Sequence, residues 1–299
     1  MTDRPIVVLG TGTMGRGIAQ VAAAAGYVTR VVDVDRALVD RALASIGDGL
    51  ARRVAEKKLE AEVRQAILDR LAPFEDIGAA AEGSWLVIEA VPENMDLKVE
   101  VLSRARDRAP SDCLLASNTS SLSITELGRR IGEGPRTIGT HFFNPPPAMP
   151  LIELVRGLHT TEATVESCRK LAERMGKTAI VVKDSPGFAT SRLGVAIGAE
   201  AIRMLESGVA SVEDIDRAME LGYRHPMGPL KLGDLVGLDV RLAILEHLHR
   251  EIGEQFRPPA LLRQMVRAGW IGKKSGRGFY RWTDGGPVPI RFEGGAPTE

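Results

Sequence analysis

Short apolar runs alternate with amphipathic stretches through the first part of the chain. The run at 5–10 (PIVVLG) stops at a glycine turn, which is typical of a buried parallel strand. The stretch at 14–26 is rich in alanine and predicts a helix. Because the predicted strands alternate with helices, the pattern indicates an α/β fold with a parallel, doubly wound sheet. The other strands are predicted at 29–34, 85–91, 113–117, 137–143, 151–155 and 178–183, and the other helices at 35–71 (a pair) and 94–108.

The strand pattern ends near residue 184, and apolar positions then recur with helical spacing. Residues 188–269 predict helices that are interrupted by a loop at 222–229 (GYRHPMGP). We therefore predict two domains, a sheet domain at 1–184 and a mostly α-helical C-terminal domain at 185–299. The final stretch, from about residue 284, is rich in glycine, proline and charge, and it predicts a loose tail.

The composition is that of an ordinary soluble protein. Apolar residues make up 44% of the chain, and 39 basic residues balance 39 acidic ones, so no net charge directs the molecule to nucleic acid or to a membrane surface. The two cysteines, Cys113 and Cys168, stand in apolar or helical patterns and predict reduced core thiols. No basic-then-apolar leader opens the sequence. A cytoplasmic location is expected, and no metal.

The glycine turn after the first strand has the spacing of a dinucleotide-binding loop. Gly10 and Gly12 permit a sharp turn and a close approach of the backbone to a pyrophosphate, and Gly15 lets the next helix pack on the strand. The start of that helix, at Thr13 and Met14, offers N–H groups to the phosphates. The sheet domain is therefore predicted to be of the Rossmann type; a purely structural tight turn is the alternative.

An acidic side chain ends the second predicted strand. Asp33 lies where a carboxylate should meet the hydroxyls of the adenosine ribose. Because that charge would repel a 2′-phosphate, the expected cofactor is NAD rather than NADP.

One histidine stands among groups that suit alcohol oxidation. Of five histidines, His141 alone lies at a strand end in the half of the sheet expected to hold the nicotinamide. Glu153 could orient its ring, and Ser120 and Asn144 lie nearby in the sequence. An imidazole with an orienting carboxylate can remove a hydroxyl proton while a dinucleotide takes the hydride. The alternatives are a structural histidine, a Glu153 that pairs with an arginine, and a Ser120 that only caps a helix.

Several motifs, in this order along the chain, resemble one family. SNTSSLSI, GTHFFNPPPAMPLIELV, DSPGF, GYRHPMGPLKLGDLVGLD and GKKSGRGFY are similar to segments of the 3-hydroxyacyl-CoA dehydrogenase family, 3-hydroxybutyryl-CoA dehydrogenase type, up to about residue 282. The resemblance implies reversible NAD-dependent oxidation of a short-chain (S)-3-hydroxyacyl-CoA to the 3-oxoacyl-CoA, in fatty acid metabolism such as β-oxidation. It also implies a homodimer formed through the second domain.

The resemblance assigns roles to particular residues. His141 would be the general base with Glu153 as its partner, and Ser120 and Asn144 would contact the substrate and the nicotinamide. Further contacts to NAD are implied for Asp33, Glu93, Lys98 and Lys274.

One position departs from the family pattern. The family often has an asparagine shortly after the PGF turn, and this chain has Ser191, whose shorter side chain carries one hydroxyl for a substrate contact from that side. The phosphates of coenzyme A could meet a basic patch on the helix pair after the second strand, and a solvated helix face is an equally good interpretation. The patch consists of Arg52, Arg53, Lys57 and Lys58.

Two other functions stay open at this point. Dehydrogenases of free 3-hydroxy acids, such as gulonate or carnitine dehydrogenases, share the sheet and the His–Glu pair, and loss of the basic patch would favour them. A non-catalytic NAD-binding structural protein is the third hypothesis, and the intact set of His141, Glu153 and Ser120 counts against it.

Overall fold

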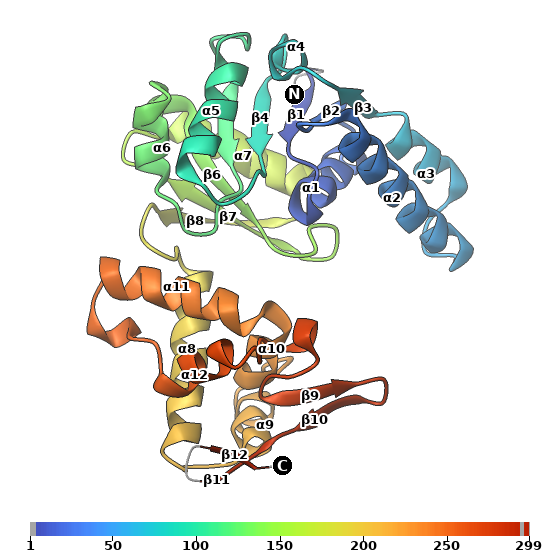
Figure 1. The fold of residues 1–299 in the computed structure, drawn as a ribbon. Helices are drawn as coiled ribbons and strands as arrows, with labels where there is room; N and C mark the ends of the chain where they lie inside the picture. The colour runs from blue at the N-terminus through green and yellow to red at the C-terminus, as the bar shows by residue number, and fades with distance from the viewer. Residues whose placement is uncertain (1–3, 294–295, 299) are drawn as a thin grey trace. The chain divides into compact units, whose positions relative to one another are not determined.

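The computed structural model describes residues 4–293 and 296–298. The chain forms two compact units, Met1–Ser185 and Pro186–Glu299. The first unit contains an eight-stranded sheet with helices on both faces (Figure 1), and the second consists mainly of helices. Within the described residues, no helix combines the length and apolar character needed to cross a bilayer.

The sheet has the strand order β3-β2-β1-β4-β5-β6-β7-β8, which places the topological switch between β1 and β4. Ligands of doubly wound sheets bind beyond the carboxyl ends of the strands at such a point. The strands are β1 (Ile6–Leu9), β2 (Thr29–Val32), β3 (Leu71–Phe74), β4 (Leu86–Glu89), β5 (Leu114–Ser117), β6 (Thr137–Phe142), β7 (Leu151–Arg156) and β8 (Thr178–Lys183).

The sheet is mostly parallel, and one pairing corrects the all-parallel prediction. β7 runs antiparallel to β6, whereas β8 pairs parallel to β7. The connection from β6 to β7 holds only residues 143–150, which is too short for the helical crossover that a parallel pair requires. The two strands consequently form a hairpin, and this reversal aligns His141 with Glu153.

Alternating side chains give the sheet a separate apolar layer on each face. On one face, α1 (Thr13–Ala24) and α7 (Glu162–Arg174) pack through residues such as Ile18 and Leu171 on Ile6, Val8 and Ile88. On the other face, Val7, Leu9 and Leu115 pack against α4 (Ile77–Ala81), α5 (Met95–Arg106) and α6 (Ile124–Arg130). Cys168 and Cys113 are buried and free in these layers, as predicted, and burial raises the pKa of Cys168 to about 12.

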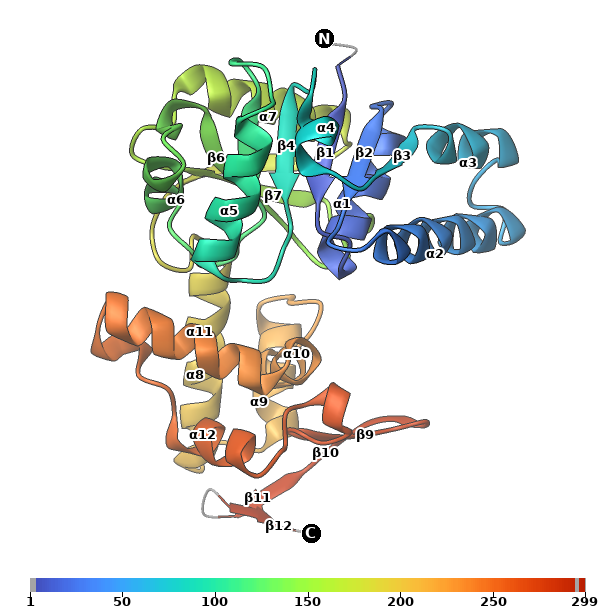
Figure 2. The same cartoon turned by 45° about the horizontal axis from the view of Figure 1, so that its top comes forward.

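The predicted pair of helices after β2 is confirmed. α2 (Arg36–Ala55) begins at the cap Asp35 and is followed by α3 (Ala61–Leu68). The pair projects beyond the β3 edge of the sheet (Figure 2). β3 itself was missed by the pattern because it is short and contains Pro73, which an edge strand tolerates.

The second unit has its own apolar core and two carboxylates that bind backbone N–H groups. Asp234 is 1% exposed and accepts hydrogen bonds from the backbone N–H of Phe279 and Tyr280 and from Nε1 of Trp282. Asp216 accepts the hydroxyl of Tyr280. The helices are α8 (Thr190–Glu206), α9 (Val212–Gly222), α10 (Pro229–Val236), α11 (Leu238–Glu251) and α12 (Ala260–Arg267).

The prediction of a loose tail from residue 284 is wrong for the described residues. β9 (Tyr280–Thr283) and β10 (Gly286–Pro289) form an antiparallel hairpin, and β11 (Arg291–Glu293) pairs with β12 (Ala296–Thr298). Glycine and proline suggested disorder, but here they supply the turn, where Gly286 has a φ of +108°.

Candidate active site

An imidazole and a carboxylate face each other across two strands. His141 in β6 is the direct partner of Glu153 in β7, and its Nδ1 lies 2.7 Å from Oε2 of the carboxylate. Glu153 is fully buried and His141 is 8% exposed. The carboxylate fixes the ring and favours the tautomer that carries its proton on Nδ1, so that the basic lone pair belongs to Nε2.

A carboxylate of the neighbouring loop holds the first residues of the loop after β5. Oε1 of Glu93 accepts the backbone N–H groups of Ser120 (3.1 Å) and Ser121 (3.2 Å) and the hydroxyl of Thr119 (2.5 Å). Burial alone would raise the pKa of Glu93, but Lys98 and the hydroxyls of Thr119 and Ser121 bring it below its usual value. Glu93, implied by the family resemblance as an NAD contact, thus also orders the loop that carries Ser120.

This loop also contacts the strand that carries the histidine. Oδ1 of Asn118 accepts the backbone N–H of Phe142 at 2.9 Å, so Ser120 and His141 lie at the same edge of the sheet. The hypothesis that Ser120 only caps the following helix is wrong, because the N-cap of α6 is Ser123, whose hydroxyl accepts the N–H of Glu126.

Behind Glu93 lies a charged group that the sequence reasoning missed. Glu89, the last residue of β4, is fully buried and contacts Lys98, which is 1% exposed. Burial raises the pKa of Glu89, and Lys98 and Ser117 oppose that effect. The signal in the sequence that could have indicated the buried charge of Glu89 is an acidic residue at the end of an otherwise apolar strand (WLVIEA).

Asn144 lies just beyond β6 in the connection to β7, and its side chain is exposed. The ammonium of Lys177 donates to the carbonyls of Pro146 and Met149, both at 2.6 Å. A Cβ on Gly17 of α1 would come within 2.7 Å of the Pro146 ring. The connection that carries Asn144 is therefore held against both α1 and the start of β8.

The glycine loop fits a bound dinucleotide. Gly10 has a φ of +94°, and a Cβ there would lie 2.9 Å from the carbonyl oxygen of Ala90. A Cβ on Gly15 would collide with the carbonyl oxygen of Gly10, whereas one on Gly12 would meet nothing within 4 Å. Gly12 thus borders open space at the N-terminus of α1, where Thr13 and Met14 begin the helix and a pyrophosphate is best held.

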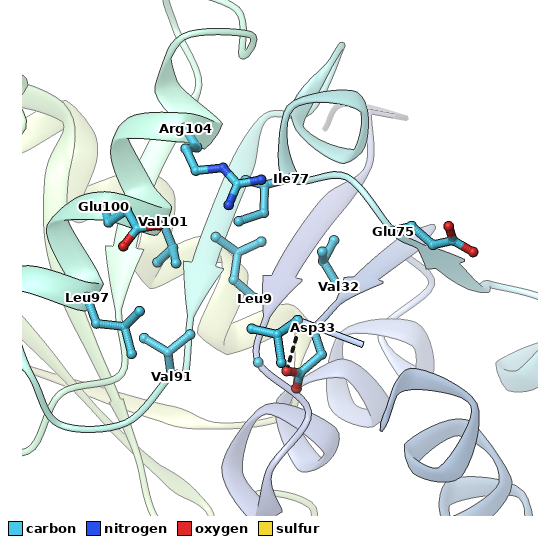
Figure 3. A pocket seen from close by; sticks show the side chains of 12 residues that line it. Leu9, Val32, Asp33, Glu75, Ile77, Val91, Leu97, Glu100, Val101 and Arg104 are labelled. Atoms are coloured by element: carbon cyan, nitrogen blue, oxygen red, sulfur yellow. Dashed lines mark hydrogen bonds between the residues drawn. The ribbon is translucent and has the colours of Figure 1, made fainter. Parts of the chain in front are cut away.

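Asp33 closes one end of a pocket of about 280 Å³ (Figure 3). Its Oδ2 accepts the N–H and the hydroxyl of Thr11 at 2.7 and 2.6 Å, which ties the glycine loop to the end of β2. The pocket is otherwise largely apolar, as an adenine ring requires. It is lined by Leu9, Gly10, Val32, Asp33, Val34, Glu75, Ile77, Val91, Leu97, Glu100, Val101 and Arg104.

The remaining predicted residues lie apart from this cluster. Arg52, Arg53, Lys57 and Lys58 are exposed at the end of α2 and just after it, and Lys58 pairs with Glu56 at 2.8 Å. Arg53 also lines a pocket of about 380 Å³ beside α1 and α3.

Two predicted residues belong to the second unit. Ser191 lies in the first turn of α8. Lys274, in the 3₁₀ helix Lys273–Ser275, pairs with Asp239 at 2.6 Å.

A Rossmann-type sheet with a glycine loop, an acid at the end of β2 and a buried His–Glu pair defines the class of dinucleotide-dependent dehydrogenases that act on a hydroxyl group. Residues 5–185 match the family described as "3-hydroxyacyl-CoA dehydrogenase, NAD binding domain", and residues 187–282 match "3-hydroxyacyl-CoA dehydrogenase, C-terminal domain". The chain belongs to the 3-hydroxyacyl-CoA dehydrogenase family; it is an oxidoreductase, and its cofactor is NAD.

Relatives match over nearly their whole length. The chain is 45% identical to a probable 3-hydroxybutyryl-CoA dehydrogenase of Bacillus subtilis over 286 residues, 95% of this chain and 99% of that one. It is 39% identical to the 3-hydroxybutyryl-CoA dehydrogenase of Bradyrhizobium diazoefficiens over 96% of this chain and 98% of that one. The crystal structure of an (S)-3-hydroxybutyryl-CoA dehydrogenase from Ralstonia eutropha superimposes with a TM-score of 0.91 at 40% identity, covering 95% of this chain and all of that one.

Proposed function

We propose that this enzyme oxidises short-chain (S)-3-hydroxyacyl-CoA, such as 3-hydroxybutyryl-CoA, to the 3-oxoacyl-CoA, in a reversible reaction. The observation that carries the proposal is the buried contact of 2.7 Å between His141 and Glu153 at the cofactor end of the sheet. The choice of a short-chain CoA ester as the substrate is supported by relatives named as 3-hydroxybutyryl-CoA dehydrogenases, which match over nearly the whole chain.

The histidine is the base of this proposal. Nε2 of His141 takes the proton of the substrate 3-hydroxyl, and Glu153 stabilises the imidazolium that forms. NAD, when bound, supplies the acceptor for the hydride from the same carbon. In the reverse direction the imidazolium returns its proton to the oxygen.

Polar groups from two connections complete the proposed site. The hydroxyl of Ser120 donates a hydrogen bond to the substrate oxygen, and Asn144 contacts the substrate and the nicotinamide end of the cofactor. Glu93, Lys98 and Lys274 are proposed as further NAD contacts, with Asp33 on the adenosine ribose. The exposed cations Arg52, Arg53, Lys57 and Lys58 are proposed to hold the phosphates of coenzyme A, and Ser191 is a proposed substrate contact on the second unit.

A substrate panel tests the proposal. Acetoacetyl-CoA, longer 3-oxoacyl-CoAs and free 3-oxo acids are each offered with NADH, and its oxidation is followed by absorbance. The short-chain CoA esters should be turned over with the highest kcat/KM. Faster turnover of free acids would favour a gulonate- or carnitine-dehydrogenase-like activity, and no turnover of any compound would favour a non-catalytic NAD-binding protein.

We expect NAD to be preferred over NADP by at least about tenfold in kcat/KM. The carboxylate of Asp33 would face a 2′-phosphate, and like charges about 4 Å apart repel each other by roughly 1–4 kcal/mol. Steady-state kinetics with both cofactors measure the ratio, and Asp33→Asn should narrow it. Equal efficiency of the wild-type enzyme with the two cofactors would contradict this assignment.

A homodimer formed through the second unit is also proposed. That unit leaves a set of large apolar side chains exposed, and a soluble monomer rarely does so over a wide area. Analytical ultracentrifugation at micromolar concentration should give twice the chain mass of 32.2 kDa, and a monomer under those conditions would reject the proposal. The set includes Leu193, Ile197, Leu221, Tyr223, Leu232, Leu235, Val236 and Val240.

The free, reduced thiols Cys113 and Cys168 support a cytoplasmic location.

A further inference from the structure

One fully buried carboxylate gathers donors from three separate segments. Oε1 of Glu89 accepts the ammonium of Lys98 at 2.9 Å and the hydroxyl of Ser117. Oε2 accepts the same ammonium at 3.0 Å and the backbone N–H of Val91 at 3.1 Å. Glu89 thereby joins the end of β4, the first turns of α5 and the end of β5. A carboxylate with this many buried partners has one well-defined position.

Two routes lead from Glu89 to the loop that carries Ser120. Along the first, Lys98 lies 3.3 Å from Oε2 of Glu93, whose other oxygen holds the N–H of Ser120 at 3.1 Å. Along the second, the hydroxyl of Ser117 donates to Glu89 and accepts the N–H of Thr119 at 3.2 Å. Both routes end next to Ser120. The second runs through buried atoms, whereas Glu93 on the first has a side chain that is 37% exposed.

We propose that Glu89 is a positioning residue for the reaction. Through Lys98 and Ser117 it holds Glu93 and residues 119–121, and so sets the place of the Ser120 hydroxyl and of the cofactor contacts beside it. Without this carboxylate, Glu93 would be the one ionic partner left to Lys98 among the described residues, and Ser117 would lose the acceptor that fixes its rotamer. The inference rests on the proposed role of Ser120 as a substrate contact.

Glu89→Gln tests the proposal with little change in side-chain volume. The amide has one oxygen in place of two, and its NH₂ group must face Lys98, Ser117 or Val91, each of which donates to Glu89. We expect kcat/KM to fall about tenfold, the size expected when one hydrogen bond is misplaced. The Kd of NAD should rise, whereas the Kd of ADP, which carries only the adenosine half of the cofactor, should stay the same; calorimetry measures both.

Asp234→Asn is the matched control, because Asp234 is also a buried carboxylate with several donors but belongs to the second unit. It should lower the melting temperature and leave the ratio of the NAD and ADP affinities unchanged. If that ratio shifts as much as in Glu89→Gln, or if Glu89→Gln weakens NAD and ADP equally, the proposal is overturned. Wild-type kcat/KM in Glu89→Gln would overturn it as well.

A milder variant covers the case in which Glu89→Gln does not fold. Ser117→Ala removes one of the two routes, and it should weaken NAD relative to ADP by a smaller factor; an unchanged ratio would then reject the proposal. The proposed catalytic function is tested separately, since retained turnover in His141→Gln would reject the assignment of the base without altering the binding ratio in Glu89→Gln.

Discussion

Substitution of His141 by alanine or by glutamine is expected to lower kcat by roughly 10²–10⁴-fold, the usual contribution of a positioned acid–base group. The imidazole is the group that accepts the substrate proton, and neither replacement can do so at neutral pH. NAD binding should be kept, because His141 lies in β6 and not in the glycine loop that precedes α1. Pre-steady-state kinetics together with an NADH fluorescence titration measure the two effects separately.

Glu153→Gln is the control for this prediction. The glutamine keeps the volume at a fully buried position but removes the negative charge beside Nδ1, so it should lose only part of what the His141 variants lose. Near-normal turnover in either His141 variant would show that another group is the base.

The second large effect is expected in the glycine loop. Gly15→Ala should weaken NAD binding by roughly 10- to 100-fold, because the displaced loop must return to its NAD-binding shape against an overpacking cost of about 1–3 kcal/mol. The new methyl group would collide with the carbonyl oxygen of Gly10, so the loop and the first turn of α1 must move apart. The melting temperature should fall as well, and calorimetry with and without NAD measures both changes.

Gly12→Ala separates a collision within the protein from one with the cofactor. Its Cβ would meet no protein atom within 4 Å, so the melting temperature should stay near that of the wild type. NAD affinity should still fall, because the methyl group would occupy the space where the backbone approaches the pyrophosphate. Unchanged NAD affinity in Gly15→Ala would be inconsistent with a cofactor held at this loop.

Local sequence patterns were sufficient to predict most of the sheet, and they also indicated the glycine loop, Asp33 and His141 as candidate site positions. The apolar run that ends at Leu9 and the alternation around His141 depend only on neighbours in the sequence, so they predict strands directly. The glycine spacing and Asp33 are similarly local signals. The antiparallel direction of β7 could not be read from alternation, because a strand has the same pattern in both directions. It could have been inferred from the short connection between β6 and β7.

The buried charges were not predictable in the same way. Glu89 meets Ser117 only because β4 and β5 are neighbours with those two residues in register, and strand order is a property of the whole fold. Lys98 looks like a surface residue in a charged helix, yet it is 1% exposed, because its ammonium turns inward to Glu89. The hairpin at 280–289 was also missed, since glycine and proline occur equally in turns and in loose tails.

The hairpin of β6 and β7 has a consequence for how this protein can change over evolution. The base and its carboxylate are opposite one another in a single ladder, with His141 across from Glu153 and Thr140 across from Leu154. If a gene gains or loses codons in the connection at 143–150, the ladder still keeps His141 opposite Glu153, although Asn144, which the connection carries, would be displaced. Deleting one codon inside either strand would turn one of them to the opposite face, so related sequences with such a deletion should have lost the dehydrogenase activity.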